Sequence, residues 1–267
     1  MTDGGGSDIE VALRLAAMAA PVALEHFERG VQSWSKADGT VVGEADLAVD
    51  KLIAAELAKV RPGDGVLSEE SDPRAGTSTR RWIIDPIDGT QEFLAGERDW
   101  GVHIALEVDG EIALGIMTRP TVGELWWAER GHGAFRRQAD GTDVRLQAAQ
   151  TTVLAGSRVA GWPESDEHIT RLRDVGAWDG EDMAFPRFLA GEIDALFARG
   201  APWDWAPVVV LVEEAGGTFQ DLAGGRSTYQ INGVASSPAL AGAVETLLQP
   251  TPGHGRGRRC EASRRIP

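Results

Sequence analysis

The sequence predicts a mixed fold, between the α+β and α/β classes, in which helices, antiparallel strands and an alternating region follow one another. Three observations support this prediction. The first 60 residues have helical periodicity, residues 80–135 contain apolar runs of strand length, and after residue 151 short strands alternate with helical segments. We therefore expect an N-terminal α+β half over residues 1–150 and a C-terminal α/β half over residues 151–250.

Two helices are predicted before the first strand. The stretch SDIEVALRLAAMAAPVALEHFERG begins at Ser7 or Asp8, both good N-cap residues, and Pro21 is expected to kink or split the helix. In EADLAVDKLIAAELAKV, five apolar side chains share roughly one helical face. These residues are Leu47, Leu52, Ile53, Leu57 and Val60. The turn RPGDG and a short extended segment, VLS, follow.

Strand-like runs separated by turns come next. They are RWIID, WGVHIALEVDG, EIALGIMTRP and ELWWAERGHGAF. The alternation in GVHIALEV predicts a half-buried antiparallel strand, and Asp109-Gly110 favours a hairpin turn. Further along, the strands TVLAGS and IDALFA alternate with helical segments around 164–174, 181–191 and 205–215. This alternation favours an α/β layer, closed by a sheet strand near GGTFQDL.

Composition sets limits on location and chemistry. No apolar run approaches the ~18 residues of a membrane span, and MTDGGGSDIE lacks the features of a signal peptide, so we expect a cytoplasmic protein. The single cysteine, Cys260, excludes intramolecular disulfides and cysteine-based metal clusters.

The charge is distributed unevenly along the chain. The net charge is −15, but residues 251–267 carry +4, which leaves −19 on the first 250 residues. An acidic body repels nucleic-acid phosphates and suits divalent cations, although the need for solubility also explains acidity. Residues 251–267 lack apolar periodicity and are rich in arginine, so we expect a disordered basic tail.

The stretch WIIDPIDGTQEF carries the clearest chemical signal. Asp85 and Asp88 follow an apolar run and flank a proline, which fixes the backbone so that both carboxylates can turn toward one point. Gly89 allows a close backbone approach, and the amides after it, at a helix N-terminus, form an anion site. Acids for a cation beside amides for an anion are what a metal-dependent phosphate site needs. A lone Asp-Pro, by contrast, would indicate only a solvated turn.

The stretches WIIDPIDGTQEF, LSEES and WDWAPVVVLVEEAGG resemble, in order and spacing, three signature regions of the inositol monophosphatase family. The resemblance runs from about residue 8 to residue 248. It implies a layered αβαβα sandwich and a lithium-sensitive hydrolase of small phosphate monoesters, which uses a metal-activated water and two or three Mg²⁺ ions. It also implies a homodimer that acts on a small phosphorylated metabolite. From the acidic charge and the lack of a long apolar run we expect neither a nucleic-acid nor a membrane partner.

The same resemblance implies roles for particular residues. The implied metal ligands are Glu69, Asp85, the backbone carbonyl of Ile87, Asp88 and Asp204. The implied catalytic residues are Asp46, Thr90 and Glu70. Asp46 and Thr90 would form a hydrogen-bonded pair that orients and deprotonates the water, and Glu70 would act from beside the ligands. The amides of Gly89 and Thr90 would hold the phosphate.

Three positions depart from the family pattern. Ser68 stands where the family usually has glycine, and Val42-Gly43 stands where it usually has threonine ahead of the acid. Trp205-Ala206-Pro207 replaces the small residues that usually follow the last ligand. We expect Trp205 to narrow the pocket or to alter the surroundings of the second metal.

The residues around Asp204 bear on the substrate. Family members that bind inositol carry a glutamate before this motif, where this chain has Phe197 or Ala198, so Arg199 is the nearest charged candidate. In WDGEDMAF, Glu181 and Asp182 would suit a cationic group of the substrate, as in the histidinol-phosphate branch, or would cap a helix or face solvent. KADGTVVGEADLAVD and RPGDGVLSEE also look similar to that branch. The preferred subtype is therefore a histidinol-phosphate phosphatase, with inositol 1-phosphate and other sugar or nucleotide phosphates as alternatives.

Two other classes of protein compete with this interpretation. A non-catalytic metal-binding relative would have lost a ligand, yet every matching acid is present. A nucleic-acid-binding module could rest only on the Arg-rich residues 251–267. His103 lies in a predicted strand, where we interpret it as a core or pocket-wall residue. Trp126 and Trp127 point to the two faces of a predicted strand, so we expect one in the core and the other at an interface.

Overall fold

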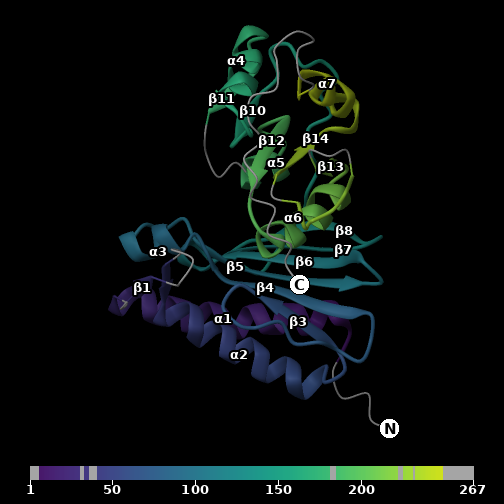
Figure 1. Ribbon diagram of the computed structural model, residues 1–267. Coiled ribbons are helices and arrows are strands. Elements are labelled where there is room, and N and C mark those ends of the chain that lie inside the picture. The colour runs from purple at the N-terminus through teal and green to yellow at the C-terminus, as the bar shows by residue number, and fades with distance from the viewer. Residues whose placement is uncertain are drawn as a thin grey trace.

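The computed structural model describes residues 6–30, 33–35, 41–180, 185–221, 225–230 and 232–248. These residues form five layers in the order helices, sheet, helix, sheet, helices (Figure 1). This is the layered αβαβα sandwich that the sequence predicts. No helix among the described residues is long and apolar enough to cross a membrane.

The first layer is a pair of long helices, α1 (Asp8–Arg29) and α2 (Glu44–Val60). Helix α1 begins at Ser7, whose N–H donates to the Glu10 carboxylate at 2.7 Å while its hydroxyl accepts from the Glu10 N–H. The predicted split at Pro21 is wrong, because α1 continues through this residue as one helix. The proline is exposed, and burial of the opposite, alanine-rich face outweighs its cost of about 3 kcal/mol.

The second layer is a seven-stranded sheet in the order β3-β4-β5-β6-β7-β8-β9. Its strands are β3 (Gly65–Ser68), β4 (Arg80–Asp88), β5 (Gly101–Val108), β6 (Glu111–Arg119), β7 (Glu124–Glu129), β8 (Gly133–Arg137) and β9 (Asp143–Arg145). Strands β3 and β4 are parallel, and the other neighbours are antiparallel. The predicted hairpin turn at Asp109-Gly110 is confirmed, since both residues have positive φ.

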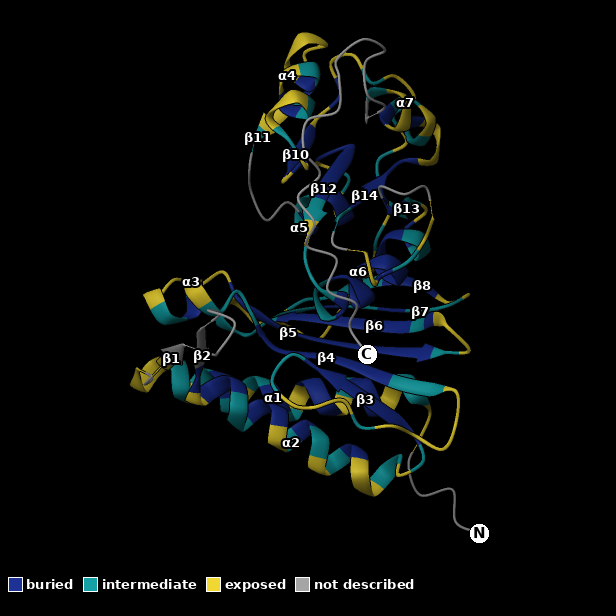
Figure 2. Cartoon of the chain, viewed as in Figure 1, coloured by how far each residue is buried: buried dark blue, intermediate teal, exposed yellow. Residues whose placement is uncertain are grey.

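The two faces of this sheet pack against different helices. Trp82 and Ile84 of β4 lie in the core shared with α1 and α2, whereas Ile83 between them lies in the core on the opposite face. The third layer, α6 (Pro202–Glu214), covers that opposite face and is buried along most of its length (Figure 2). Gly115 of β6 permits this close packing, because a Cβ atom there would lie 2.5 Å from the Cα atom of Pro207.

The fourth layer is a five-stranded sheet in the order β11-β10-β12-β14-β13. Its strands are β10 (Val159–Gly161), β11 (Trp178–Gly180), β12 (Ala195–Arg199), β13 (Thr218–Asp221) and β14 (Asn232–Ser236). The fifth layer consists of α4 (Asp166–Asp174) and α7 (Pro238–Leu248), which bury Leu172, Leu240 and Val244 against the sheet. The shorter elements are β1 (Ser33–Ser35), β2 (Val41–Gly43), α3 (Thr90–Ala95), the 3-10 helix η1 (Pro120–Val122) and α5 (Phe185–Leu189).

The second half of the chain shows the largest differences from prediction. TVLAGS is a loop rather than a strand, because Val153 is exposed and Gly156 adopts positive φ; the strand forms later, as β10. The segment 181–191 contains only the short α5, and residues 181–184 are outside the described part. The two sheets draw their strands from either side of residue 150, but the division into halves stays a prediction, as does the disordered tail, which is not described.

Candidate active site

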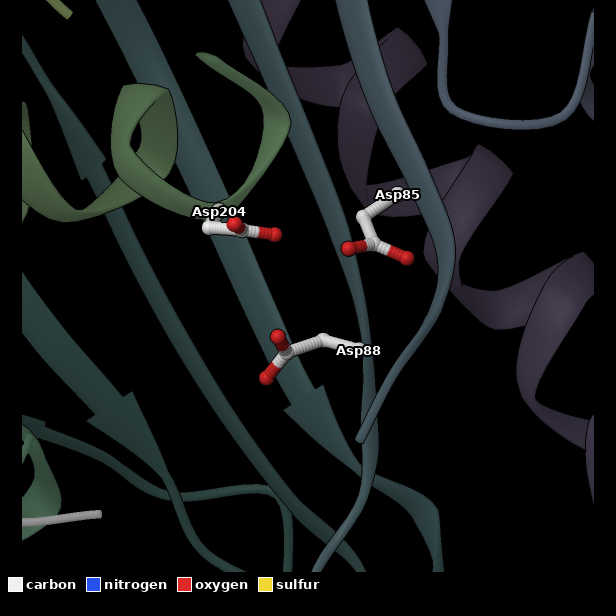
Figure 3. Close-up of side chains that lie close together, drawn as sticks. All are labelled: Asp85, Asp88 and Asp204. Carbon is white, nitrogen blue, oxygen red and sulfur yellow. The ribbon is translucent and has the colours of Figure 1, made fainter. Parts of the chain in front are cut away.

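The carboxylates of Asp85, Asp88 and Asp204 come together where β4 ends and α6 begins (Figure 3). One carboxylate oxygen of each residue lies within 4.8 Å of the corresponding oxygens of the other two. The first two residues belong to one strand and the third belongs to a helix from a distant part of the chain. The structure thus joins the two halves of the predicted ligand set at one point.

A bulge in β4 explains how two aspartates three residues apart can face the same way. In a regular strand an odd spacing would put Asp85 and Asp88 on opposite faces of the sheet. Asp85 pairs with His103 of β5, but Asp88 pairs with Gly101, so β4 has one residue more than its partner over this interval. The extra residue restores the phase, and both side chains approach Asp204, which belongs to the helix on that face.

The start of α6 fixes the third carboxylate. Pro202 occupies the first turn, and the Asp204 carboxylate accepts a hydrogen bond from the Ala201 N–H at 2.6 Å. This contact satisfies a free amide at the helix N-terminus, where a negative charge is also favoured by the helix dipole. Asp204 is therefore a capping residue as well as a member of the cluster.

The pKa values of all three aspartates in the cluster are raised above the ordinary value. Burial, and then the charges of Glu69, Asp88 and Asp204, hold the pKa of Asp85 well above its ordinary value. Burial and nearby Glu92 and Asp99 raise the pKa of Asp88 to about 7, while burial and Asp88 raise that of Asp204 to about 6. In the described part of the chain, no arginine or lysine forms an ion pair with Asp85, Asp88 or Asp204.

Glu69, directly after β3, lies next to this cluster, but its carboxylate is not one of the three whose oxygens lie within 4.8 Å of one another. Ser68, the last residue of β3, pairs with Ile84, and the Glu69 N–H donates to the Ile84 carbonyl at 3.2 Å. Glu69 therefore lies beside Asp85, whose pKa its charge raises. Glu70 is half-buried next to it, with its N–H 3.5 Å from the Ser68 hydroxyl.

His103 forms the wall of the cluster on β5. Its Nε2 atom lies 3.4 Å from Asp88 Oδ2, and burial lowers the pKa of the imidazole to about 4. The ring is neutral at physiological pH and does not offset the negative charge. Its place in a buried strand beside a cavity fits the predicted pocket-wall role.

The predicted pair of Asp46 and Thr90 is in contact. Asp46 is 1% exposed, and its second carboxylate oxygen accepts from the Gly43 N–H at 3.0 Å. The Thr90 hydroxyl oxygen lies 3.4 Å from Asp46 Oδ1 and 3.0 Å from the Ile87 carbonyl oxygen. The single hydroxyl proton can therefore be donated to either acceptor.

Gly89 makes the turn from β4 into α3. Its φ of 82° is in the left-handed region, and a Cβ atom there would lie 2.9 Å from the Asp99 carbonyl oxygen. No other residue fits this turn without displacing the backbone. The turn places the first amides of α3 directly after Asp88.

A cavity of about 130 Å³ adjoins the carboxylates. It is lined by Asp88, His103, Trp162, Phe185, Leu196, Ala198, Arg199, Asp204 and Trp205. The two residues named for the glutamate position face opposite sides of β12: Ala198 lines the cavity, while Phe197 faces the opposite core. Trp205 is 2% exposed, forms part of the wall and packs on Phe219 at 5.1 Å between ring centroids.

The predicted substrate-side residues have different outcomes. Arg199 lines the cavity, is exposed and forms no ion pair with a described residue. Glu181 and Asp182 lie outside the described residues, and the neighbouring Asp179 pairs with Arg187. The pocket residues Trp162 and Phe185 were missed, because nothing in their local sequence distinguishes them from core aromatics. The functional roles of all these residues stay predictions.

Known proteins place the chain in a family. The sequence model of the inositol monophosphatase family matches residues 7–251. A Streptomyces griseus protein named glucose-1-phosphate thymidylyltransferase is 42% identical, with 92% of this chain and 99% of that protein covered. The histidinol-phosphatase of Chlorobaculum parvum is 38% identical, with 86% and 92% covered. The crystal structure of extragenic suppressor protein suhB from Bartonella henselae is 30% identical with a TM-score of 0.78, covering 90% and 98%.

The chain therefore belongs to the inositol monophosphatase family. Membership confirms the predicted family resemblance and the predicted enzyme class, a phosphoric monoester hydrolase. The names of the relatives differ in the substrate and, for the Streptomyces griseus protein, in the reaction.

Proposed function

We propose that this protein is a Mg²⁺-dependent hydrolase of a small phosphate monoester, with histidinol phosphate as the preferred substrate. The observation that supports the proposal is the cluster of Asp85, Asp88 and Asp204, in which one carboxylate oxygen of each residue lies within 4.8 Å of the others and each pKa is raised by burial and by neighbouring carboxylates. A divalent cation would remove that repulsion. A donor set made only of oxygen atoms suits a hard cation such as Mg²⁺.

The proposed site uses residues from three elements. The residues that would hold two or three Mg²⁺ ions are Glu69, Asp85, the Ile87 carbonyl, Asp88 and Asp204. Bound Mg²⁺ would supply positive charge that stabilises the phosphoryl oxygens and makes water more acidic. The amides of Gly89 and Thr90 would bind the phosphate at the start of α3, where backbone N–H groups lack intrahelical partners.

Asp46 and Thr90 would accept the proton that the attacking water loses. When the Thr90 hydroxyl donates to the buried Asp46 carboxylate, its oxygen keeps lone pairs that can accept a proton from water. The competing acceptor is the Ile87 carbonyl at 3.0 Å, so occupation of that carbonyl by a cation would leave the hydroxyl proton to Asp46. Glu70, beside Glu69, would assist from the adjoining turn.

The cavity supports a flat leaving group of low polarity. Trp162, Phe185, Leu196, Ala198 and Trp205 give it aromatic and aliphatic walls, which suit an imidazole ring better than the many hydroxyls of inositol. Alanine at position 198 leaves no acid to receive inositol hydroxyls. The guanidinium of Arg199 would bind phosphate or hydroxyl oxygens, while Glu181 and Asp182 would attract the amine. The Chlorobaculum parvum relative supports the same choice by its name.

A sugar 1-phosphate is the second candidate substrate. The Streptomyces griseus relative favours it, because its name contains glucose 1-phosphate. Nucleotidyl transfer itself is less well supported, since the cavity of about 130 Å³ is small beside the ~300–1,000 Å³ typical of ligand pockets. Hydrolysis of an aldose 1-phosphate needs no room for a nucleotide.

Location and assembly belong to the same proposal. We infer a cytoplasmic homodimer that acts on a small phosphorylated metabolite, as the sequence predicts. The net charge of −15 supports the exclusion of nucleic acid from the partners.

A substrate panel tests the proposed function. With Mg²⁺, kcat/KM for histidinol phosphate is expected to exceed that for inositol 1-phosphate, glucose 1-phosphate and phosphoadenosine phosphate by ~10-fold or more, since mismatched polar groups are costly in an apolar pocket.

Trp162→Ala should raise KM for histidinol phosphate ~3–10-fold and leave kcat unchanged, because it removes an aromatic wall of the cavity. Phosphate release measures both, and Trp178→Ala, on the outer face of the same sheet, is the control.

The possible results of the panel separate the competing interpretations. Equal, poor rates on every substrate would indicate an unusual sugar phosphate. Preference for glucose 1-phosphate would support the second candidate. Absence of Mg²⁺-dependent release from any monoester, in a folded protein, would contradict the proposal and favour a non-catalytic relative.

A further inference from the structure

Asp50 and Ser68 form a buried hydrogen bond that the proposed reaction does not use. The Ser68 hydroxyl donates to Asp50 Oδ1 at 2.6 Å, and the Ser71 hydroxyl donates to the same oxygen at 3.4 Å. Asp50 is 5% exposed and Ser68 is 4% exposed. A short O–H···O⁻ contact shielded from water belongs to the strong class of hydrogen bonds.

The two serines that contact Asp50 lie on either side of Glu69, a candidate metal ligand, in the sequence. Ser68 ends β3 and directly precedes Glu69, while Ser71 follows two residues after Glu69. The Ser68 hydroxyl also accepts from the Glu70 N–H at 3.5 Å. Asp50 therefore contacts the turn that contains Glu69 both before and after that residue.

Helix α2 connects this turn to the other part of the site. Asp46 and Asp50 are four residues apart on α2, so their side chains lie on the same face, one turn from each other. Asp46 contacts Thr90, which follows β4, and Asp50 contacts Ser68, which ends the neighbouring parallel strand β3. The helix thereby fixes the spacing between the segments that follow these two strands.

We propose that Asp50, acting through Ser68, is a positioning residue that holds the Glu69 carboxylate in place for a divalent cation. The proposal rests on the proposed function, because it takes Glu69 as a ligand. Without the hydrogen bond, the turn would sample other conformations and Glu69 would reach the cation less often.

Mn²⁺ affinity tests the proposal without reference to turnover. In the full-length protein, the Kd for Mn²⁺, measured by electron paramagnetic resonance, is expected to rise ~10-fold or more in Asp50→Asn and in Ser68→Ala. Ser68→Thr keeps the hydroxyl and should stay within ~3-fold of wild type.

The matched control is Asp64→Asn, at the other end of β3. Asp64 is also 5% exposed and accepts hydrogen bonds from Trp82 Nε1 at 2.9 Å and from Arg80. Its removal is expected to lower the melting temperature but to leave the Mn²⁺ affinity unchanged. The comparison separates positioning of Glu69 from the general effect of removing a buried carboxylate.

Unchanged Mn²⁺ affinity in folded Asp50→Asn and Ser68→Ala would overturn this inference and leave the proposed function standing. Absence of Mn²⁺ binding by the wild-type protein would overturn both. If Asp50→Asn does not fold, the milder Ser68→Ala decides the matter, with the circular dichroism spectrum as the measure of folding.

Discussion

Asp88→Asn is expected to lower Mg²⁺-dependent phosphate release by ~10³-fold or more while the protein remains folded. Asp88 belongs to the carboxylate cluster and also lines the cavity, so it lies between the proposed cations and the substrate. The substitution replaces the carboxylate by a carboxamide of nearly the same shape, which removes the negative charge without creating a void. Initial rates with saturating Mg²⁺ measure the effect, and circular dichroism measures folding.

The control for this experiment is Asp99→Asn. Asp99 is one of the charges that raise the pKa of Asp88, but its side chain is half exposed and paired with Arg119. This variant should retain activity within a few-fold of wild type. Turnover by folded Asp88→Asn within tenfold of wild type would remove Asp88 from the site.

Removal of divalent cations is expected to make the free energy of unfolding fall as pH rises from about 4 to about 7. In the folded protein the pKa of Asp88 is about 7 and that of Asp204 about 6, against an ordinary value of 3.8. Between these values the native state binds more protons than the unfolded chain does. The contribution to stability is therefore complete below the unfolded pKa and is lost as pH rises through the folded pKa values.

Melting temperatures in EDTA and in Mg²⁺, at pH 5 and pH 8, measure this effect. Mg²⁺ should stabilise the wild type most at pH 8, where the carboxylates are ionised. In EDTA at pH 8, Asp88→Asn should melt at a higher temperature than the wild type, and the difference should shrink at pH 5. A wild type that is the more stable of the two in EDTA at pH 8 would contradict the repulsion on which the site is built.

Much of the candidate site could be predicted because its proposed ligands occur in short, ordered motifs. The spacing of Asp85 and Asp88 around a proline indicated a common target, and the structure supplies the cause, a bulge in β4. The bulge itself depends on pairing with β5, which local sequence does not specify. The approach of Asp204 likewise depends on packing of α6 against β6, through Gly115.

The buried face of α2 shows where periodicity misleads. Apolar spacing put Leu47 and Leu52 on one helical face with Leu57, yet both are only half-buried, while the charged Asp46 and Asp50 are buried. Charged side chains are rarely buried unless they are paired, and Thr90 and Ser68, whose hydroxyls contact these two carboxylates, lie far away in sequence. The i, i+4 spacing of the two aspartates was the available signal, because it places both on one face.

The substrate side was harder to predict than the metal side. Phe197 and Ala198 could be separated only once β12 was placed in register with β14, since strand phase decides which side chain faces the cavity. Residues of β4, β5, β12, α5 and α6 line the small cavity together with Trp162, so no single motif describes it. Trp205 lines this cavity, and its expected effect on the width of the pocket or on the second metal stays a prediction.

Anomalous diffraction from crystals soaked with Mn²⁺ and phosphate tests the central claim most directly. Cation peaks are expected within about 2–2.4 Å of carboxylate oxygens of Glu69, Asp85, Asp88 and Asp204, with phosphate beside the Gly89 turn. Mn²⁺ found only at other surface acids, with these four side chains turned away from one another, would contradict the account.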